Sequence, residues 1–295
     1  MSEHRCGDVA IVGRPNVGKS TLLNALVGAK VSIATPRPQT TRNRIAGIRT
    51  VPGAQIIFLD TPGLHAARSP LNRRMVQTAR DTLSVADVVL LVLDATAGLT
   101  RPNAGLLDEL VGRRAKLVIA LNKVDRTAKP ALLPLLAEIG SRWPGPAVVP
   151  VSATRGVQLD ALLDEIVRLL PAGPPRFEAD DYTTASMRFL AQELIREQVF
   201  LATEQEIPYG SAVVVERWED DPGRNLVVIQ ATVLVERPAH KGIVIGKGGA
   251  RLRTIGQAAR LEIEQLVGKR VYLELFVRVE PGWMRRADRV AELDP

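Results

Sequence analysis

A glycine-bounded stretch near the start of the chain restricts the possible folds more than any other feature. Residues 13–20 read G-R-P-N-V-G-K-S, which matches the phosphate-binding pattern G-x-x-x-x-G-K-S. The apolar run 8–12 predicts a buried strand before it, and Leu22, Leu23 and Leu26 predict a helix after it. Such a turn surrounds phosphates with backbone N–H groups. The stretch therefore predicts a P-loop α/β domain, with an incidental glycine turn as the alternative.

The residues of this P-loop have distinct expected tasks. Lys19 is expected to reach the β- and γ-phosphates, and the Ser20 hydroxyl is expected to ligate Mg²⁺. The predicted nucleotide-binding residues of the loop are Gly13, Arg14, Pro15, Asn16, Val17, Gly18, Lys19, Ser20 and Thr21.

A second pattern, D-x-x-G, follows the predicted strand 55–59. Its aspartate is expected to hold Mg²⁺ through water, and the N–H of its glycine is expected to meet the γ-phosphate. Because this pattern follows a P-loop and lies at a strand end, it is far more specific here than alone. The nucleotide-binding residues predicted from it and its neighbour are Asp60, Thr61, Pro62, Gly63 and Leu64.

Two further strand ends predict a guanine base. Strand 116–121 ends in N-K-V-D, and strand 147–151 leads into S-A-T-R-G. The carboxylate of Asp125 would accept hydrogen bonds from the ring N1–H and the exocyclic amine, a donor pair that adenine does not offer. Asn122 is expected to tie the loops together, the Lys123 stem to cover the base plane, and the Ala153 N–H to donate to guanine O6. This base-reading set is Asn122, Lys123, Val124, Asp125, Ser152 and Ala153.

Composition limits the compartment and the number of domains. With 295 residues, 46% of them hydrophobic, the chain is long enough for two domains with their own cores. Its apolar runs are too short to span a bilayer, and no export signal is visible, so we expect a cytoplasmic protein. One cysteine and three scattered histidines argue against an internal disulfide and a zinc cluster.

The pattern of elements changes after residue 172. Up to there, strands alternate with helices, which predicts a mostly parallel sheet covered on both faces. We expect this α/β P-loop GTPase domain at residues 1–172, a linker at 173–183 and an α+β domain at 184–295. The second domain reads helix, strand, strand, helix, G-K-G-G, helix, strand, which is the order of a type II K homology (KH) domain.

Local charge in the second domain favours RNA. Residues 184–295 hold 16 basic and 16 acidic side chains, so bulk charge predicts nothing. Between Arg237 and Arg260, however, six residues are basic and none is acidic. Basic side chains and a glycine loop can approach phosphates closely. The predicted RNA-binding residues are Lys241, Gly246, Lys247, Gly248, Gly249, Arg251 and Arg253; the alternative is a helix–turn–helix with a solvated basic face.

With its P-loop, D-x-x-G, N-K-V-D and S-A-T-R-G motifs, the loop P-Q-T-T-R and the KH-like second half, the chain resembles the Era family of bacterial GTPases over nearly its whole length. The resemblance implies GTP hydrolysis to GDP, binding of 16S rRNA near its 3′ end, and a role in assembly of the 30S subunit. It also implies a cytoplasmic protein, with part of the population peripheral on the inner membrane. We further expect a monomer.

The resemblance also assigns catalytic positions. Thr41 is expected to complete the Mg²⁺ coordination, with Thr40 as the alternative, so that the catalytic set is Lys19, Thr41 and Gly63. Leu64 stands where other GTPases place a water-orienting glutamine, so the sequence names no catalytic base. His65 is more often incidental in such a loop, and Arg42 and Arg44 are arginine-finger candidates only by proximity.

Three alternatives stay open at this point. Asn16 stands where related GTPases place a K⁺ ligand, but it could equally brace the loop. The chain could be a regulatory switch acting on a protein or membrane, with a second domain that does not bind RNA. It could also be an RNA-binding protein in which the nucleotide is only structural.

Overall fold

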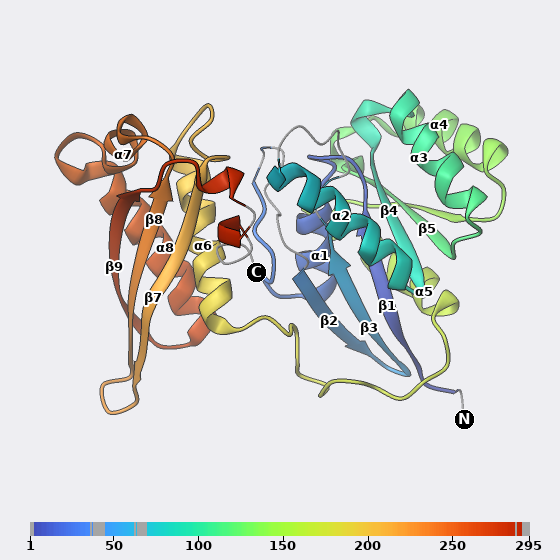
Figure 1. Cartoon of the computed structure of the whole chain (residues 1–295). Helices are drawn as coiled ribbons and strands as arrows, with labels where there is room; N and C mark the ends of the chain where they lie inside the picture. Colours follow the sequence, from blue (N-terminus) through green and yellow to red (C-terminus); the bar gives the residue numbers. More distant parts are fainter. Residues whose placement is uncertain are drawn as a thin grey trace. The chain divides into compact units, whose positions relative to one another are not determined.

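The computed structural model describes residues 3–35, 37, 45–61, 63, 70–286 and 288–290, and for residues 70–76 only the backbone. It contains two compact units, whose boundary in the second half of the chain falls between Thr184 and Ala185 (Figure 1). The positions outside the described residues include several that carry predictions: Thr40, Thr41, Arg42, Arg44, Pro62, Leu64 and His65.

The first unit is a six-stranded sheet with helices between its strands. Strand order is β2-β3-β1-β4-β5-β6, and every neighbouring pair is parallel except β2 with β3. This confirms the predicted, mostly parallel α/β fold. Its strands are β1 (Arg5–Val12), β2 (Ile45–Val51), β3 (Ala54–Asp60), β4 (Val88–Asp94), β5 (Leu117–Asn122) and β6 (Ala147–Pro150). Its α-helices are α1 (Lys19–Val27), α2 (Pro70–Val85), α3 (Arg101–Gly112), α4 (Lys129–Arg142) and α5 (Leu159–Leu169).

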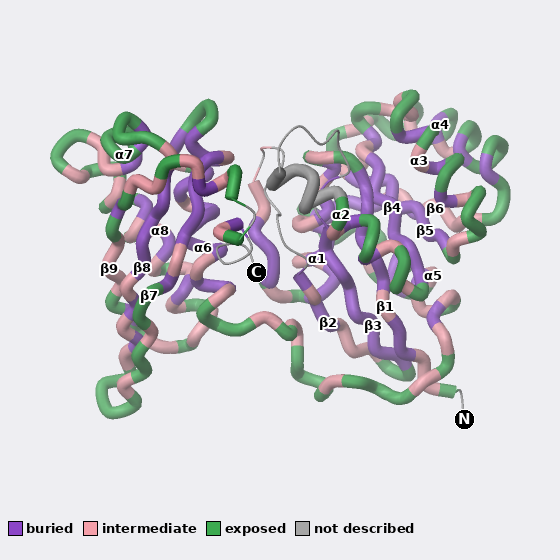
Figure 2. The backbone as a smooth tube through the Cα atoms, viewed as in Figure 1, coloured by how far each residue is buried: buried purple, intermediate pink, exposed green. Residues whose placement is uncertain are grey.

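Alternate residues of the central strand enter two different cores. In β1, Val9 and Ile11 pack in the core that contains leucines of α1 and α5. Ala10 and Val12 pack in the opposite core, with Leu107 of α3. The side chains of a strand alternate between its two faces, so a strand that is apolar throughout must be covered on both. Figure 2 shows the result, with buried strands between partly exposed helices.

The sequence did not predict α4. It carries Pro130 in its first turn and Pro134 within the helix, and proline inside a helix removes a backbone donor. Burial of Leu135 and Ile139 in the core around α3 compensates for that loss. Local propensity disfavours this helix, and tertiary packing stabilises it.

The second unit has the predicted order of elements. Strands β7 and β8 are antiparallel, β8 and β9 are parallel, and the sheet order is β7-β8-β9. Helices cover one face of the sheet, while Tyr272 and Phe276 on β9 are about half exposed. The elements are α6 (Met187–Ala202), β7 (Ser211–Asp221), β8 (Leu226–Val235), α7 (Pro238–Ile245), α8 (Ala250–Val267) and β9 (Arg270–Val279).

Residues 171–183, which include the predicted linker, are hydrogen-bonded to the first unit. The buried side chain of Gln55 accepts from the backbone N–H groups of Arg176 and Phe177 at 2.7 and 3.0 Å. Further along, the N–H of Ile48 donates to the carbonyl of Tyr182, and the Thr183 hydroxyl donates to the Ala46 carbonyl. This stretch therefore runs along the sheet edge formed by β2. Among the described residues, no helix combines the length and apolarity needed to cross a membrane.

Candidate nucleotide site and basic glycine loop

The P-loop connects β1 to α1 through backbone angles that side chains rarely adopt. Gly13 has φ +152° and Gly18 has φ +95°. A Cβ atom on Gly18 would lie 2.5 Å from the amide nitrogen of Asn122, and one on Gly13 would lie 2.5 Å from the Val92 carbonyl oxygen. Only glycine combines this backbone with this closeness, which explains both glycines of the motif.

Lys19 folds back into the loop. Its ammonium nitrogen donates to the carbonyls of Gly13 and Arg14, both at 3.2 Å, and its side chain is nearly fully buried. Burial lowers the pKa of Lys19 to about 8, although the nearby charge of Asp60 acts in the opposite direction. A phosphate at this position would supply the negative charge that a buried ammonium lacks.

Three hydroxyl and carboxylate groups meet at the end of β3. The hydroxyl of Ser20 donates to Oδ2 of Asp60 at 2.8 Å, and the hydroxyl of Ser32 donates to the same oxygen at 2.9 Å. Asp60 is completely buried. Hydroxyl and carboxylate oxygens are the ligands that Mg²⁺ prefers, so Ser20 and Asp60 suit this ion.

The rest of the D-x-x-G segment lies against the P-loop. The Thr61 hydroxyl donates to the Ile11 carbonyl at 2.7 Å, which fixes the segment beside β1. A Cβ atom on Gly63 would lie 2.9 Å from the backbone nitrogen of Pro15. The structure thus brings Gly63 to the P-loop, where the sequence predicts a γ-phosphate contact.

Asn122 joins the two loops that the sequence assigns to the base. Its amide nitrogen donates to the Val17 carbonyl at 3.0 Å, and its amide oxygen accepts from the Ala153 N–H at 3.1 Å. The Ala153 N–H, which is expected to meet guanine O6, is therefore engaged by Asn122 here. The Ser152 hydroxyl donates to Oδ1 of Asp125 at 2.6 Å and orients that carboxylate.

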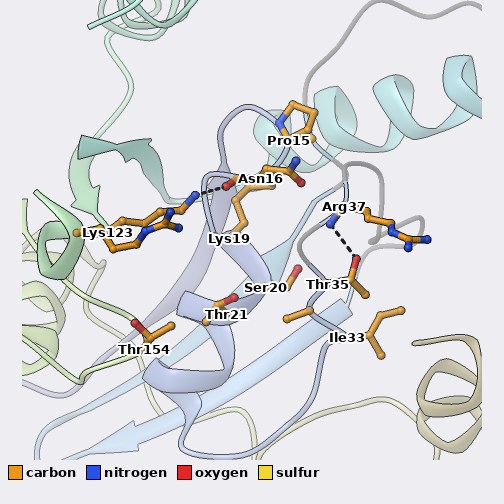
Figure 3. Close-up of a pocket in the computed structure, with 14 residues that line it drawn as sticks. Pro15, Asn16, Lys19, Ser20, Thr21, Ile33, Thr35, Arg37, Lys123 and Thr154 are labelled. Carbon is orange, nitrogen blue, oxygen red and sulfur yellow. Dashed lines mark hydrogen bonds between the residues drawn. The ribbon is translucent and has the colours of Figure 1, made fainter. Parts of the chain in front are cut away.

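Lys19, Ser20 and Gly63 line a cavity of about 390 Å³ (Figure 3). Its lining does not include Asp60, Asn122 or Asp125. Figure 3 shows Lys19, Ser20 and Thr21 on α1 and Lys123 from the loop after β5, on the opposite side of the cavity from Thr35. Its lining combines residues of the P-loop, the segment 33–37, the D-x-x-G glycine and the base-reading loops: Pro15, Asn16, Gly18, Lys19, Ser20, Thr21, Ile33, Ala34, Thr35, Arg37, Gly63, Lys123, Arg126 and Thr154.

Sequence reasoning missed Asp94. Its Oδ2 accepts from Lys123 Nζ at 2.7 Å, and the same ammonium donates to the Asn16 carbonyl at 2.6 Å. Partial burial would raise the pKa of the Asp94 carboxyl, but hydrogen bonds from Lys123 and Thr96 hold it below its ordinary value. Asp94 thus positions Lys123 across the P-loop. An acidic residue at the end of the apolar strand β4 was the available signal.

The second unit carries the basic glycine loop, residues 246–249 between α7 and α8. Gly246, Gly248 and Gly249 all have positive φ, at 73°, 59° and 78°. Four predicted RNA-binding side chains around it are exposed: Lys241, Lys247, Arg251 and Arg253.

A groove of about 350 Å³ begins at Gly249. Leu252, Leu273 and Leu275 give it an apolar lining, and Arg253 and Arg260 add positive charge. An apolar floor can take unstacked bases, and basic side chains can take the backbone phosphates. The groove and the loop therefore suit a single strand of nucleic acid.

Known protein families match parts of both units of the chain. Residues 8–123 match a family model described as 50S ribosome-binding GTPase, and residues 206–284 match a KH domain model. GTPase Era from Geobacter metallireducens is 47% identical over 98% of this chain and 97% of its own length. GTPase Era from Nitratidesulfovibrio vulgaris (strain Miyazaki F) is 45% identical over 96% and 94%.

The chain belongs to the Era family of GTPases. Its reaction is therefore hydrolysis of GTP to GDP and phosphate. A solved Era in complex with MgGDPNP and nucleotides 1506–1542 of 16S ribosomal RNA is 40% identical, with a TM-score of 0.94 over 98% of both chains. An Aquifex aeolicus Era variant bound to GDP·AlF4⁻ is also 40% identical, with a TM-score of 0.93 over 98% of both chains.

Proposed function

We propose that this Era family GTPase binds GTP with Mg²⁺ in the P-loop cavity and the 3′ end of 16S rRNA at the basic glycine loop. Its role would be in assembly and maturation of the 30S ribosomal subunit. The observation that carries the RNA half is the groove that opens beside Gly249, with basic side chains at its rim. The similar Era bound to a 16S rRNA fragment supports the choice of RNA.

The loop offers a direct test of RNA binding in the full-length protein. Gly248→Asp adds a negative charge where phosphates would approach and should weaken binding of a 16S 3′-end RNA at least about tenfold. Gly268→Asp is the matched control, since Gly268 has φ +66°, close to the +59° of Gly248, and neither has an atom within 4 Å of an added Cβ.

The two outcomes separate the proposal from its rival. Loss of RNA affinity in Gly248→Asp alone, with basal GTP hydrolysis retained, supports a division of labour between the units. Equal RNA affinity in both variants and the wild type would mean that the basic glycine loop is a plain turn. The remaining candidate would then be a regulatory switch acting on a protein or membrane.

For Mg²⁺ we propose Ser20 as a direct ligand and Asp60 as a ligand through water. Thr41 would complete the set, with Thr40 as the alternative. The support is the convergence of the Ser20 hydroxyl and the Asp60 carboxylate at 2.8 Å. When bound, the ion would neutralise charge on the phosphates. Lys19 would bind the phosphates beside it, and Asp125 would select guanine through the carboxylate that Ser152 orients.

We also propose that Asn16 ligates K⁺, which would supply positive charge beside the β- and γ-phosphates. Asn16 has φ +66°, a conformation that asparagine tolerates, so bracing of the loop remains the competing explanation. Asn16→Gly removes the side chain without adding strain. Faster hydrolysis in K⁺ than in Na⁺ that disappears in Asn16→Gly supports the ion, whereas equal wild-type rates in both salts support bracing.

For the cell, we propose a cytoplasmic monomer, with part of the population associated peripherally with the inner membrane. Fractionation of cells, with and without a high-salt wash of the membranes, tests this distribution. A peripheral protein should leave the membranes in high salt, because screening weakens its attraction to anionic lipids. Absence from the membrane fraction at any ionic strength would restrict the proposal to the cytoplasm.

A further inference from the structure

Ser32 lies in the P-loop cavity region but belongs to none of the nucleotide motifs. It is 2% exposed, and its hydroxyl is 2.9 Å from Oδ2 of Asp60. The Ser20 hydroxyl donates to that same oxygen at 2.8 Å. Two hydroxyl donors on one carboxylate oxygen restrict rotation of the carboxylate, because any rotation would lengthen one bond or the other.

The backbone of Ser32 is itself held in place by helix α1. The amide nitrogen of Asn24 donates to the Ser32 carbonyl at 2.7 Å. The amide oxygen of Asn24 accepts from the N–H groups of Ser32 and Val31 at 2.9 and 3.0 Å. Asn24 and Ser20 are four residues apart and share one face of α1. The helix therefore positions both donors that act on Asp60, Ser20 directly and Ser32 through Asn24.

We propose that Ser32 is a positioning residue for Mg²⁺, which holds the Asp60 carboxylate in the orientation that the metal needs. The hydroxyl of Ser32 donates a hydrogen bond to Oδ2 of Asp60, the oxygen that also accepts from Ser20. Metal-ligating carboxylates are commonly held by outer hydrogen bonds, whose loss costs metal affinity. The inference rests on the proposed Mg²⁺-dependent nucleotide binding.

Ser32 also directly precedes residues of the nucleotide cavity. Ile33, Ala34 and Thr35, directly after it, line the nucleotide cavity. A bond from Ser32 to Asp60 therefore links this side of the cavity to the metal carboxylate. The residue thus gives the metal site a contact with residues 31–35 in addition to the contact through Ser20.

The test is a Mg²⁺ titration of GDP affinity, followed with a fluorescent GDP analogue in the full-length protein. In Ser32→Ala, the Mg²⁺ concentration at half-effect should rise roughly 10-fold to 100-fold. GDP affinity in EDTA should stay within about twofold of wild type, because no phosphate or base contact is removed. Ser32→Cys, with a weaker donor of similar shape, should fall between the two.

Two comparisons make the result specific. Ser141→Ala removes an exposed hydroxyl on α4 whose bond is to the Glu138 carbonyl, and it should leave the titration unchanged. In an Asp60→Asn background, which removes the carboxylate, adding Ser32→Ala should produce no further shift. A second full shift in that background would mean that Ser32 acts independently of Asp60, which overturns the inference.

The outcomes also separate this inference from the proposed function. A wild-type protein whose GDP affinity ignores Mg²⁺ would contradict the Mg²⁺-dependent function itself. If the wild type responds to Mg²⁺ and both Ser32→Ala and Ser32→Cys titrate at the wild-type midpoint, the role of Ser32 alone is overturned. Equal losses of affinity with and without Mg²⁺ would also overturn it, since they would indicate a general structural role.

Discussion

The glycines of the P-loop and those of the basic glycine loop differ in what surrounds them. A Cβ on Gly13 or Gly18 would lie 2.5 Å from a neighbouring protein atom. In the basic glycine loop, a Cβ on Gly246 would lie 2.8 Å from Cβ of Arg251, but at Gly248 and Gly249 no heavy atom lies within 4 Å of such a Cβ. The protein's own packing shapes the first loop, whereas the second is open at Gly248 and Gly249.

This difference separates two reasons for using the same residue. In the P-loop, glycine lets the backbone pass close to other parts of the protein, so the site is formed before a ligand arrives. In the basic glycine loop, glycine supplies a left-handed backbone and leaves room for another molecule. Substitutions should therefore damage the first site through the fold and the second through the ligand.

The largest expected effect compares one substitution at the two loops. Gly18→Ala should lower GTP affinity about 100-fold or more, since strain and a blocked neighbour together cost about 3 kcal/mol. The neighbour cannot easily move, because Asn122 donates to the Val17 carbonyl at 3.0 Å. Gly248→Ala should cost about 1–2 kcal/mol of stability and leave GTP affinity unchanged. Titrations of GTP and thermal melts of both variants measure this, and near-wild-type GTP binding by Gly18→Ala would contradict the comparison.

The next effect concerns the base. Asp125→Asn places an amide donor where an acceptor is needed, so GTP affinity should fall at least tenfold, a cost of about 1–3 kcal/mol. Xanthosine triphosphate, which offers an acceptor there, should bind better than to the wild type. Asp108→Asn, which changes an exposed side chain on α3 in the same unit, is the control. Unchanged affinity for GTP in Asp125→Asn would remove this residue from the base-reading set.

A smaller effect follows from the buried ammonium of Lys19. Burial lowers its pKa to about 8, and bound phosphates should raise it. Below pH 8 both states carry the proton and GTP affinity should be flat. Above pH 8 binding must take up a proton, so affinity should fall by up to about tenfold per pH unit.

The control for this pH dependence is Lys19→Arg, because a guanidinium stays charged over the whole range. Its affinity should be lower than that of the wild type but flat with pH. GTP titrations between pH 7 and 9 at constant ionic strength provide the comparison. A wild-type profile that stays flat throughout would show that burial does not lower the pKa of Lys19.

The smallest expected effect lies at the exposed loop. Lys247→Ala should remove roughly one phosphate contact, so the slope of log affinity for RNA against log salt should decrease by about one unit. The control is Lys269→Ala, which removes the same kind of side chain. Nζ of Lys269 lies 2.5 Å from Oδ2 of Asp220, and Lys269 does not line the groove. Measurements of RNA affinity over a salt series test the pair. Identical slopes in wild type and Lys247→Ala would separate this lysine from the RNA.

Sequence alone predicted the parts of the site that are built from adjacent residues. The P-loop, D-x-x-G and N-K-x-D each place several required groups within a few positions at a strand end, so the local pattern identifies them. The order of elements in the second unit was also predictable, because its helices and strands carry strong periodic patterns.

The parts that escaped prediction depend on contacts between distant positions. Ser32 is 28 residues from Asp60, and Asp94 is 29 residues from Lys123. Nothing in the local sequence distinguishes Ser32 from an ordinary loop residue, and the position of Asp94 at the end of β4 does not by itself identify Lys123 as its partner. Helix α4 was not predicted because Pro134 locally disfavours a helix. Packing of its buried side chains in the core stabilises it.

The attachment of residues 171–183 changes how much of the chain between the two units can act as a tether. Tyr182 and Thr183 are bonded to β2, and the Ser186 hydroxyl already caps α6 by accepting from the Phe189 N–H. Thr184 and Ala185 lie between these anchors. A segment of this length reaches roughly 3.5 Å per residue. Glycines inserted after Ala185 should therefore change the motional freedom between the units far more than the same glycines inserted after Pro174.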